Sequence, residues 1–221
     1  MSEQYDPREA DATPENNEAE ENVVSVWSGS GNMKFSRRRY FDGFVFYETL
    51  NEKGKRELHK VYTGTWYTQE LSPAQRKRNR LIYVLLCLAG AALLLLGCTR
   101  VININSKLYG AAPAFAGLFG FGWMAVAVFN EFTVPQRRTI GEYRAASLSL
   151  RRSGLLCAIS CGLTFLLTVI FGLIGGGELW VHVLAAASEL VAAVAGYLVR
   201  HIESRVEYSQ ERSKDAGKYT M

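Results

Sequence analysis

Four long apolar runs constrain this chain more than any other feature of its sequence. The runs are Leu81–Thr99, Ala111–Asn130, Gly154–Ile174 and Leu179–Val199, and Glu189 is the single charged residue among them. A helix of roughly 20 apolar residues crosses a bilayer core about 30 Å thick. Backbone groups in lipid must be hydrogen-bonded within their own segment, which favours helices. We therefore predict an all-α membrane protein, a bundle of four transmembrane helices in the lipid bilayer.

The alternative is a soluble bundle of four buried helices. Helices of soluble proteins carry a polar stripe, and Leu81–Thr99 has none. Four cysteines in 221 residues, all within the apolar runs, are too few for a disulfide scaffold. The acidic N-terminal segment lacks the apolar core of a secretory signal. We therefore expect the first run to remain in the mature protein as an anchor.

Basic residues alternate in number across the expected loops. From the segment before the first run to the C-terminal tail, Lys and Arg number 4, 2, 5, 0 and 5. Because Lys and Arg are enriched in cytoplasmic loops, we predict a multi-pass protein of the cytoplasmic (plasma) membrane with both termini in the cytoplasm. The four basic residues before the first run also suit anionic lipid headgroups; they are Arg76, Lys77, Arg78 and Arg80.

The sequence outside the apolar runs differs strongly from one end to the other. Residues 1–32 begin with a net charge of −7 over the first 22 positions and are expected to form a disordered acidic tail. Residues 33–71 form a separate cytoplasmic region. Residues 72–201 make the four-helix transmembrane domain, and residues 202–221 are a cytoplasmic tail.

Residues 33–71 have the pattern of a β-hairpin. Two runs rich in aromatic and β-branched residues, Tyr40–Leu50 and Arg56–Gln69, flank a polar turn at Asn51–Lys55 that contains glycine. An isolated hairpin is marginally stable, so it needs a third strand, a partner or the membrane surface. Basic and aromatic residues also alternate here, which suits single-stranded nucleic acid. Membrane topology already explains the basic residues at 76–80, so nucleic-acid binding is disfavoured.

The loop between the second and third apolar runs is long and basic. Pro135 is expected to end or kink the second helix. Two structures are open for Thr139–Arg152: a basic helix lying on the membrane surface, or a solvated helical extension of the third apolar run. Composition does not decide between them.

Glu189 is the most informative residue because ionisable groups inside a membrane are costly. Helical spacing places His182 on the same stripe of the fourth run, and Cys161 and Thr164 on a matching stripe of the third. These four residues are the candidate intramembrane polar site. One reading is a proton or ion path. The others are a neutral glutamic acid hydrogen-bonded across a helix interface, for example to Thr164, or a pairing with a partner protein.

Small residues recur at four-residue spacing in three of the runs and permit close helix contact. We expect them to serve the internal bundle, with a homo-oligomer as the alternative. They are Ala112, Ala116, Gly120, Gly154, Ala158, Gly162, Ser188, Ala192 and Gly196.

The sequence contains no nucleotide-binding loop, zinc-protease motif or nucleophile elbow. No cofactor or metal is expected, and an enzyme is disfavoured. The leading hypothesis is a membrane scaffold or accessory subunit that presents the hairpin to a cytosolic protein partner. The alternative is a small transporter component, coupled to protons or ions, that uses Glu189.

Overall fold

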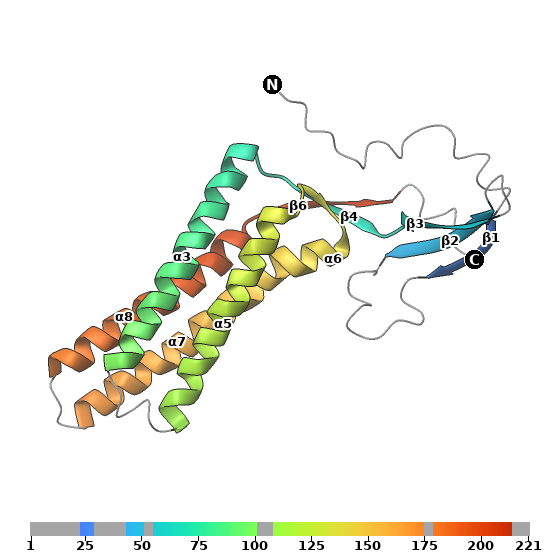
Figure 1. The fold of residues 1–221 in the computed structure, drawn as a ribbon. Coiled ribbons are helices and arrows are strands. Elements are labelled where there is room, and N and C mark those ends of the chain that lie inside the picture. The colour runs from blue at the N-terminus through green and yellow to red at the C-terminus, as the bar shows by residue number, and fades with distance from the viewer. Residues whose placement is uncertain (1–22, 29–42, 51–54, 101–107, 175–178, 214–221) are drawn as a thin grey trace. The chain divides into compact units, whose positions relative to one another are not determined.

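The structure, a computed structural model, describes residues 23–28, 43–50, 55–100, 108–174 and 179–213 (Figure 1). The chain divides into two compact units. One contains residues 1–65 and 212–221, and the other contains residues 66–211. The larger unit holds all the long helices.

Four helices in the larger unit are long and apolar enough to cross a membrane. This finding confirms the prediction of four apolar helices. Each contains one of the four apolar runs and extends beyond it by up to eight residues at one or both ends. The helices are α3 (Pro73–Arg100), α5 (Leu108–Thr133), α7 (Ser149–Ile174) and α8 (Leu179–Ser204).

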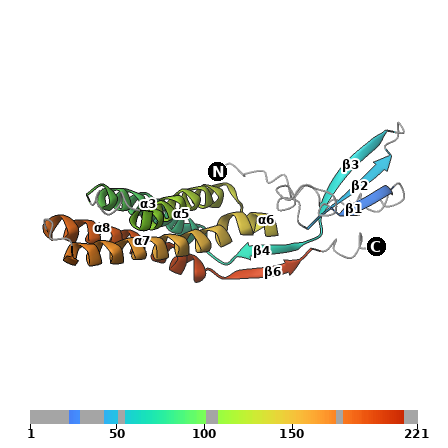
Figure 2. The same cartoon turned by 90° about the horizontal axis from the view of Figure 1, so that it is seen from below.

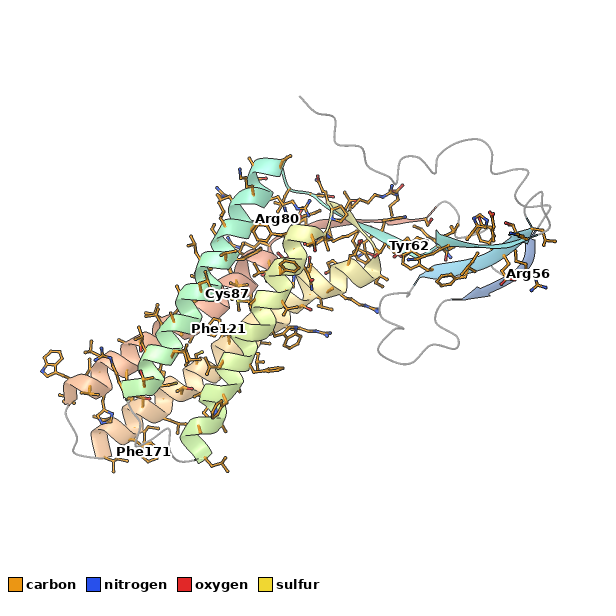
Figure 3. All side chains as sticks on the ribbon, in the orientation of Figure 1. Arg56, Tyr62, Arg80, Cys87, Phe121 and Phe171 are labelled. Atoms are coloured by element: carbon orange, nitrogen blue, oxygen red, sulfur yellow. The ribbon has the colours of Figure 1, made fainter. Side chains whose placement is uncertain are left out.

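The four helices pack as an up-down-up-down bundle. Each contacts the next one along the chain, and α8 closes the ring by packing against α3. The core between them contains Tyr83, Leu94, Met124 and Leu150, all 2% exposed or less. Figure 3 shows Cys87 and Phe121 at the α3–α5 interface, where the Cys87 thiol lies 3.6 Å from the Phe121 carbonyl oxygen. Helix neighbours in sequence are therefore neighbours in space, as short connections dictate.

The outer surface of the bundle is apolar. Leu85, Leu88, Phe115, Phe119 and Phe129 are all at least 65% exposed. Side chains of this kind would be buried in a soluble bundle. The fully buried positions, in contrast, include serine, threonine, cysteine and glutamate. This inverted distribution fits a bundle surrounded by lipid.

Glycine lets α7 and α8 approach closely. A Cβ atom at Gly196 would lie 2.7 Å from the Cβ of Cys157, and one at Gly154 would lie 2.8 Å from the carbonyl oxygen of Gly196. Gly162 has no neighbouring atom within 4 Å among the residues described. Small residues of the predicted set thus serve the internal α7–α8 contact, whereas Gly162 does not.

The smaller unit contains a three-stranded antiparallel sheet of order β1-β2-β3. Its strands are β1 (Val23–Ser28), β2 (Phe44–Leu50) and β3 (Arg56–Tyr62). In the β2–β3 hairpin Phe44 pairs with Tyr62 and Leu50 pairs with Arg56. The predicted hairpin is therefore present, and β1 supplies the third strand that it needs. The prediction that residues 1–32 are disordered is wrong for Val23–Ser28, which pair with β2.

The predicted second strand, Arg56–Gln69, is interrupted at Thr63 and Gly64. The backbone N–H groups of both residues donate to the carbonyl oxygen of Gly43. Gly43 itself has a positive φ of 84°. The Tyr62 ring covers this turn, and a Cβ atom at Gly64 would lie 2.6 Å from its hydroxyl oxygen. The β2–β3 ladder ends here. Residues 40–42 of the predicted first strand and the turn at 51–54 lie outside the described residues.

The remaining strands form a second sheet of order β5-β4-β6. They are β4 (Thr65–Gln69), β5 (Arg137–Arg138) and β6 (Tyr208–Arg212). Figures 1 and 2 show β4 and β6 side by side beyond the end of the bundle where α3 begins and α8 ends. The predicted cytoplasmic tail therefore begins with the end of α8 and a strand.

The loop between α5 and α7 is helical. Thr139 caps α6 (Ile140–Tyr143) with a capping box completed by Glu142. A π-helical turn, η2 (Arg144–Leu148), then leads directly into α7. Of the two predicted structures, the extension of the third apolar run is the one observed. It is not fully solvated, because Ala146 and Ser147 are buried.

Candidate functional site

Glu189 lies in the middle of α8 with none of its surface exposed. Neither carboxyl oxygen has a hydrogen-bond partner among the described residues. The helix packs against α3 on one side and α7 on the other, so the side chain is enclosed by the bundle. An unpaired carboxylate in such a place costs several kcal/mol. The group is therefore stable here as a neutral acid or with a cation bound.

Residues of α3 and α7 surround this carboxyl. A Cβ atom at Gly97 would lie 2.9 Å from Cγ of Glu189, so glycine makes room for the side chain. The thiols of Cys98 and Cys161 lie close enough to interact electrostatically with it. The Thr168 hydroxyl faces the carboxyl without the geometry of a hydrogen bond. The neighbours named here are thus weakly polar, and none of them is a cation.

The structure brings together part of the predicted site. Cys161 is fully buried beside Glu189. Thr164 is also buried, but its hydroxyl donates to the Ser160 carbonyl of its own helix at 2.9 Å. Thr168, one turn further along α7, is the hydroxyl that faces the carboxyl. His182 lies seven residues before Glu189 on α8, about 10 Å along the helix axis.

No group of three or more His, Cys, Asp or Glu side chains in the described part of the chain could hold a metal ion. Glu189 has one hydroxyl and two thiols as neighbours. Hard cations such as Na⁺, Mg²⁺ or Ca²⁺ need several oxygen ligands. The described neighbours of Glu189 are therefore a poor ligand set for such a cation.

A second buried polar cluster lies where α5 ends, and it was not predicted from the sequence. Arg138 and Glu131 are both fully buried and form a two-pronged ion pair: Nη1 donates to Oε2 at 2.9 Å and Nη2 to Oε1 at 3.0 Å. Arg138 also donates to the Ser147 hydroxyl and to Oε1 of Gln69. Such planar pairing is the strong form of the carboxylate–guanidinium interaction.

Glu203 extends this cluster to α3 and α8. Its Oε2 accepts from the Tyr83 hydroxyl and its Oε1 from the Tyr208 hydroxyl, both at 2.8 Å. The Tyr208 and Ser147 hydroxyls are 2.6 Å apart, which joins Glu203 to the Arg138 pair. We call these residues the polar lock, and they are Gln69, Tyr83, Glu131, Arg138, Ser147, Glu203 and Tyr208.

The ionisation of the polar lock follows from these contacts. Burial alone would lower the pKa of Arg138, but the hydrogen bonds and charge of Glu131 outweigh burial and raise it. Burial and then the neighbouring Glu203 raise the pKa of the Tyr208 phenol. Near neutral pH Arg138 is therefore charged and Tyr208 is a neutral donor. The polar lock holds the strands β4, β5 and β6 to the helix ends.

Two of the four basic residues predicted to meet lipid headgroups are directed into the protein. Arg76 and Arg80 both donate to the carbonyl oxygen of Val134, just after α5. Figure 3 shows Arg80 between the start of α3 and the end of α5. Cations are favourable at a helix C-terminus. Lys77 and Arg78 remain exposed.

Sequence carried one signal for the polar lock. Glu131 directly follows the second apolar run, and Glu203 follows the fourth by four residues, so both acids stand at the ends of membrane-length helices. Acids at such positions need partners if they are buried. Nothing in the sequence indicates that the partners are Arg138 and Tyr83.

No known family model, curated protein or solved structure matches this chain. Its function is therefore argued from its own residues.

Proposed function

We propose that the chain is a multi-pass protein of the cytoplasmic membrane with both termini in the cytoplasm. The apolar outer surface of the four helices supports insertion in lipid. The alternating numbers of Lys and Arg, 4, 2, 5, 0 and 5, support the orientation. On this orientation the polar lock and the β5-β4-β6 sheet lie at the cytoplasmic side.

The cytoplasmic end of the bundle also suits anionic headgroups. Among the exposed basic side chains at this end are residues of α3, α7 and α8 and the residue after α8. Each cation near an anionic surface contributes about 1 kcal/mol. The proposed lipid contacts are Lys77, Arg78, Arg152, Arg200 and Arg205, in place of Arg76 and Arg80.

Within the membrane the protein acts as a scaffold or accessory subunit that presents the β1-β2-β3 sheet to a cytosolic protein. The observation that carries this proposal is the way in which the polar lock holds β4. Gln69, at the end of β4, is 3% exposed and accepts from Arg138. Only Thr63 and Gly64 separate β4 from β3 in the chain. The sheet is therefore tethered to the bundle by a very short connection.

The sheet offers an edge for a partner. β3 pairs with β2 on one side, and in the described residues no strand pairs with its other side. Leu58 on this strand is 61% exposed. Open edge strands add a strand from another protein, with backbone hydrogen bonds and side-chain pockets together providing the affinity.

The test is purification of the tagged full-length protein from its own membranes in mild detergent. A stoichiometric partner should be retained by the unmodified protein and lost by Leu58→Asp, which adds a charge to the exposed edge. Gln210→Asp, which adds the same charge on exposed β6, is the control and should keep the partner. If both variants keep the partner, or if none is bound, the sheet is not the presenting surface.

A further inference from the structure

A groove lies between the last turns of α7 and the first turns of α8. Its volume is about 280 Å³, and it is almost entirely apolar. Leu173 and Leu179, at its mouth, are 77% and 63% exposed. Figure 3 labels Phe171 at this end of the bundle, opposite the end at which Arg80 lies. The groove thus lies at the end of the bundle far from Arg80 and extends inward past Thr168 to Phe165.

Two polar side chains line this groove, His182 and Thr168. The Nδ1 atom of His182 is buried and has no hydrogen-bond partner among the described residues. Gly172 allows this placement, because a Cβ atom there would lie 3.0 Å from Cβ and Cγ of His182. A ring nitrogen placed in this way can hydrogen-bond to a water molecule in the groove.

Thr168 belongs to both the groove and the surroundings of Glu189. It is 2% exposed, and its hydroxyl faces the carboxyl from α7. The other groups that face Glu189 are Cys98 on α3 and Cys161 on α7. On α8 itself the neighbouring Ser188 hydroxyl donates to the Ala185 carbonyl. Thr168 is therefore the hydroxyl that connects the carboxyl to the groove.

We propose that Glu189 is a proton-binding site that exchanges with the α7–α8 groove through the Thr168 hydroxyl, with His182 at the entrance. A hydronium ion in the groove gives its proton to the Thr168 oxygen and is left as water, and this water can donate a hydrogen bond to Nδ1 of His182. The original Thr168 proton passes to a Glu189 oxygen, where the new O–H bond forms. The carboxylate becomes a neutral acid, Thr168 is regenerated, and no electron is transferred. This activity is independent of the presentation of the sheet.

A proton fits this site better than a metal cation does. Glu189 is enclosed by two thiols, one hydroxyl and the backbone position of Gly97, so few oxygen ligands are available. A proton needs only one covalent partner and one hydrogen-bond acceptor. Protonation also removes the cost of a buried unpaired charge.

Infrared difference spectroscopy on the full-length protein in lipid nanodiscs tests the proposal. At neutral pH the carbonyl band of a protonated carboxyl should be present and should be absent from Glu189→Gln. Transfer to deuterated buffer should shift this band promptly in the unmodified protein. Thr168→Val should slow that shift at least tenfold. Thr164→Val is the matched control, because Thr164 is equally buried but is bonded to Ser160, and it should exchange at the unmodified rate.

Each other result counts against the proposal. A carboxylate band for Glu189 at neutral pH, or a band that changes with Na⁺ concentration at fixed pH, would show that the site holds a cation. Equal exchange rates in Thr168→Val and Thr164→Val would show that protons reach Glu189 by another route. If Glu189→Gln does not fold, Glu189→Asp keeps an acid and moves the band, so the assignment can still be made.

Discussion

Two sets of buried acids lie in the same bundle and differ in what surrounds them. In the polar lock each oxygen of Glu131 and Glu203 accepts a hydrogen bond, from Arg138, Tyr83 or Tyr208. In the middle of α8, both oxygens of Glu189 are without a partner in the described structure. All three carboxyl groups are buried to a similar extent, so the two sets differ in their hydrogen-bond partners. A satisfied acid fixes structure, whereas an unsatisfied acid is available to a proton.

The largest expected effect is on the ion pair of the polar lock. Arg138→Met removes two short hydrogen bonds to the buried Glu131 and leaves it the longer ion pair with Arg76 Nε, at 3.8 Å. The free energy of unfolding should fall by on the order of 3–5 kcal/mol. Unfolding of the helices by titration with denaturing detergent, followed by circular dichroism, measures this loss. Arg137→Met is the control, because Arg137 pairs with Glu211 at the surface and should cost about 0–1 kcal/mol. Equal losses of unfolding free energy in the two variants would show that the buried ion pair contributes no more than the surface pair.

Tyr208 should contribute less and should give the polar lock a dependence on alkaline pH. Tyr208→Phe removes a donor to Glu203 and should cost about 1–3 kcal/mol. The pKa of the folded phenol is raised above its ordinary value of 10.0. Its contribution is therefore complete below about pH 10 and is lost as pH rises toward the folded pKa. Stability measured from pH 8 to 11 should fall at the alkaline end, and the fall should be smaller in Tyr208→Phe.

Gly97→Ala tests the packing around Glu189. The added Cβ would lie 2.9 Å from Cγ of Glu189 and 2.7 Å from the Ser188 hydroxyl. We expect a loss of about 1 kcal/mol, at the lower end of the range for overpacking, because the two nearest contacts are side-chain atoms and the backbone carbonyl oxygen of Ala185 is further away, at 3.2 Å. Gly162→Ala is the control: it meets no atom within 4 Å, so it should not destabilise the protein. Thermal unfolding in one detergent compares the two.

The smallest expected effect is that of Glu189→Gln. This change keeps the shape and the neutral polarity of a protonated carboxyl, so stability should change by less than about 1 kcal/mol. Glu131→Gln breaks a charged pair and should cost on the order of 3 kcal/mol. The same detergent titration measures both. A large loss from Glu189→Gln would mean that Glu189 has a structural partner, and the contrast between the two sets of acids would fail.

The sequence predicted the helices well because each apolar run is long and almost uncharged. It also located Glu189 and Cys161 at one helix interface, because helical periodicity fixes which residues share a face. The sequence predicted Thr164 as the partner of Glu189, whereas Thr168 faces the carboxyl. The two threonines are one turn apart on the same face of α7, so helical periodicity does not distinguish them. Which residues of two neighbouring helices lie at the same height is set by tertiary packing, and helical periodicity gives no information about it.

The polar lock could not be predicted for a different reason. Tyr83 and Glu203 are 120 positions apart, and their contact depends on the closure of the whole ring of helices. Arg138 is one of five basic residues in its loop, and the orientation of the helices in a membrane already explains such residues. The break between β3 and β4 was also missed, because the alternation of side chains continues through Thr63 and Gly64 and only the backbone bonds to Gly43 reveal the turn.

The π-helical turn η2 gives the chain one residue more than a regular α-helix would use over the same stretch. That extra residue determines which way Arg138 and Ser147 point relative to α7. Deleting one residue between 144 and 148 would let a regular helix form and would turn the preceding segment by about 100° around the axis. The bundle would keep all four helices, while Arg138 would leave Glu131. Packing of the helix bundle and attachment of the strands are thus separable by the deletion of a single residue.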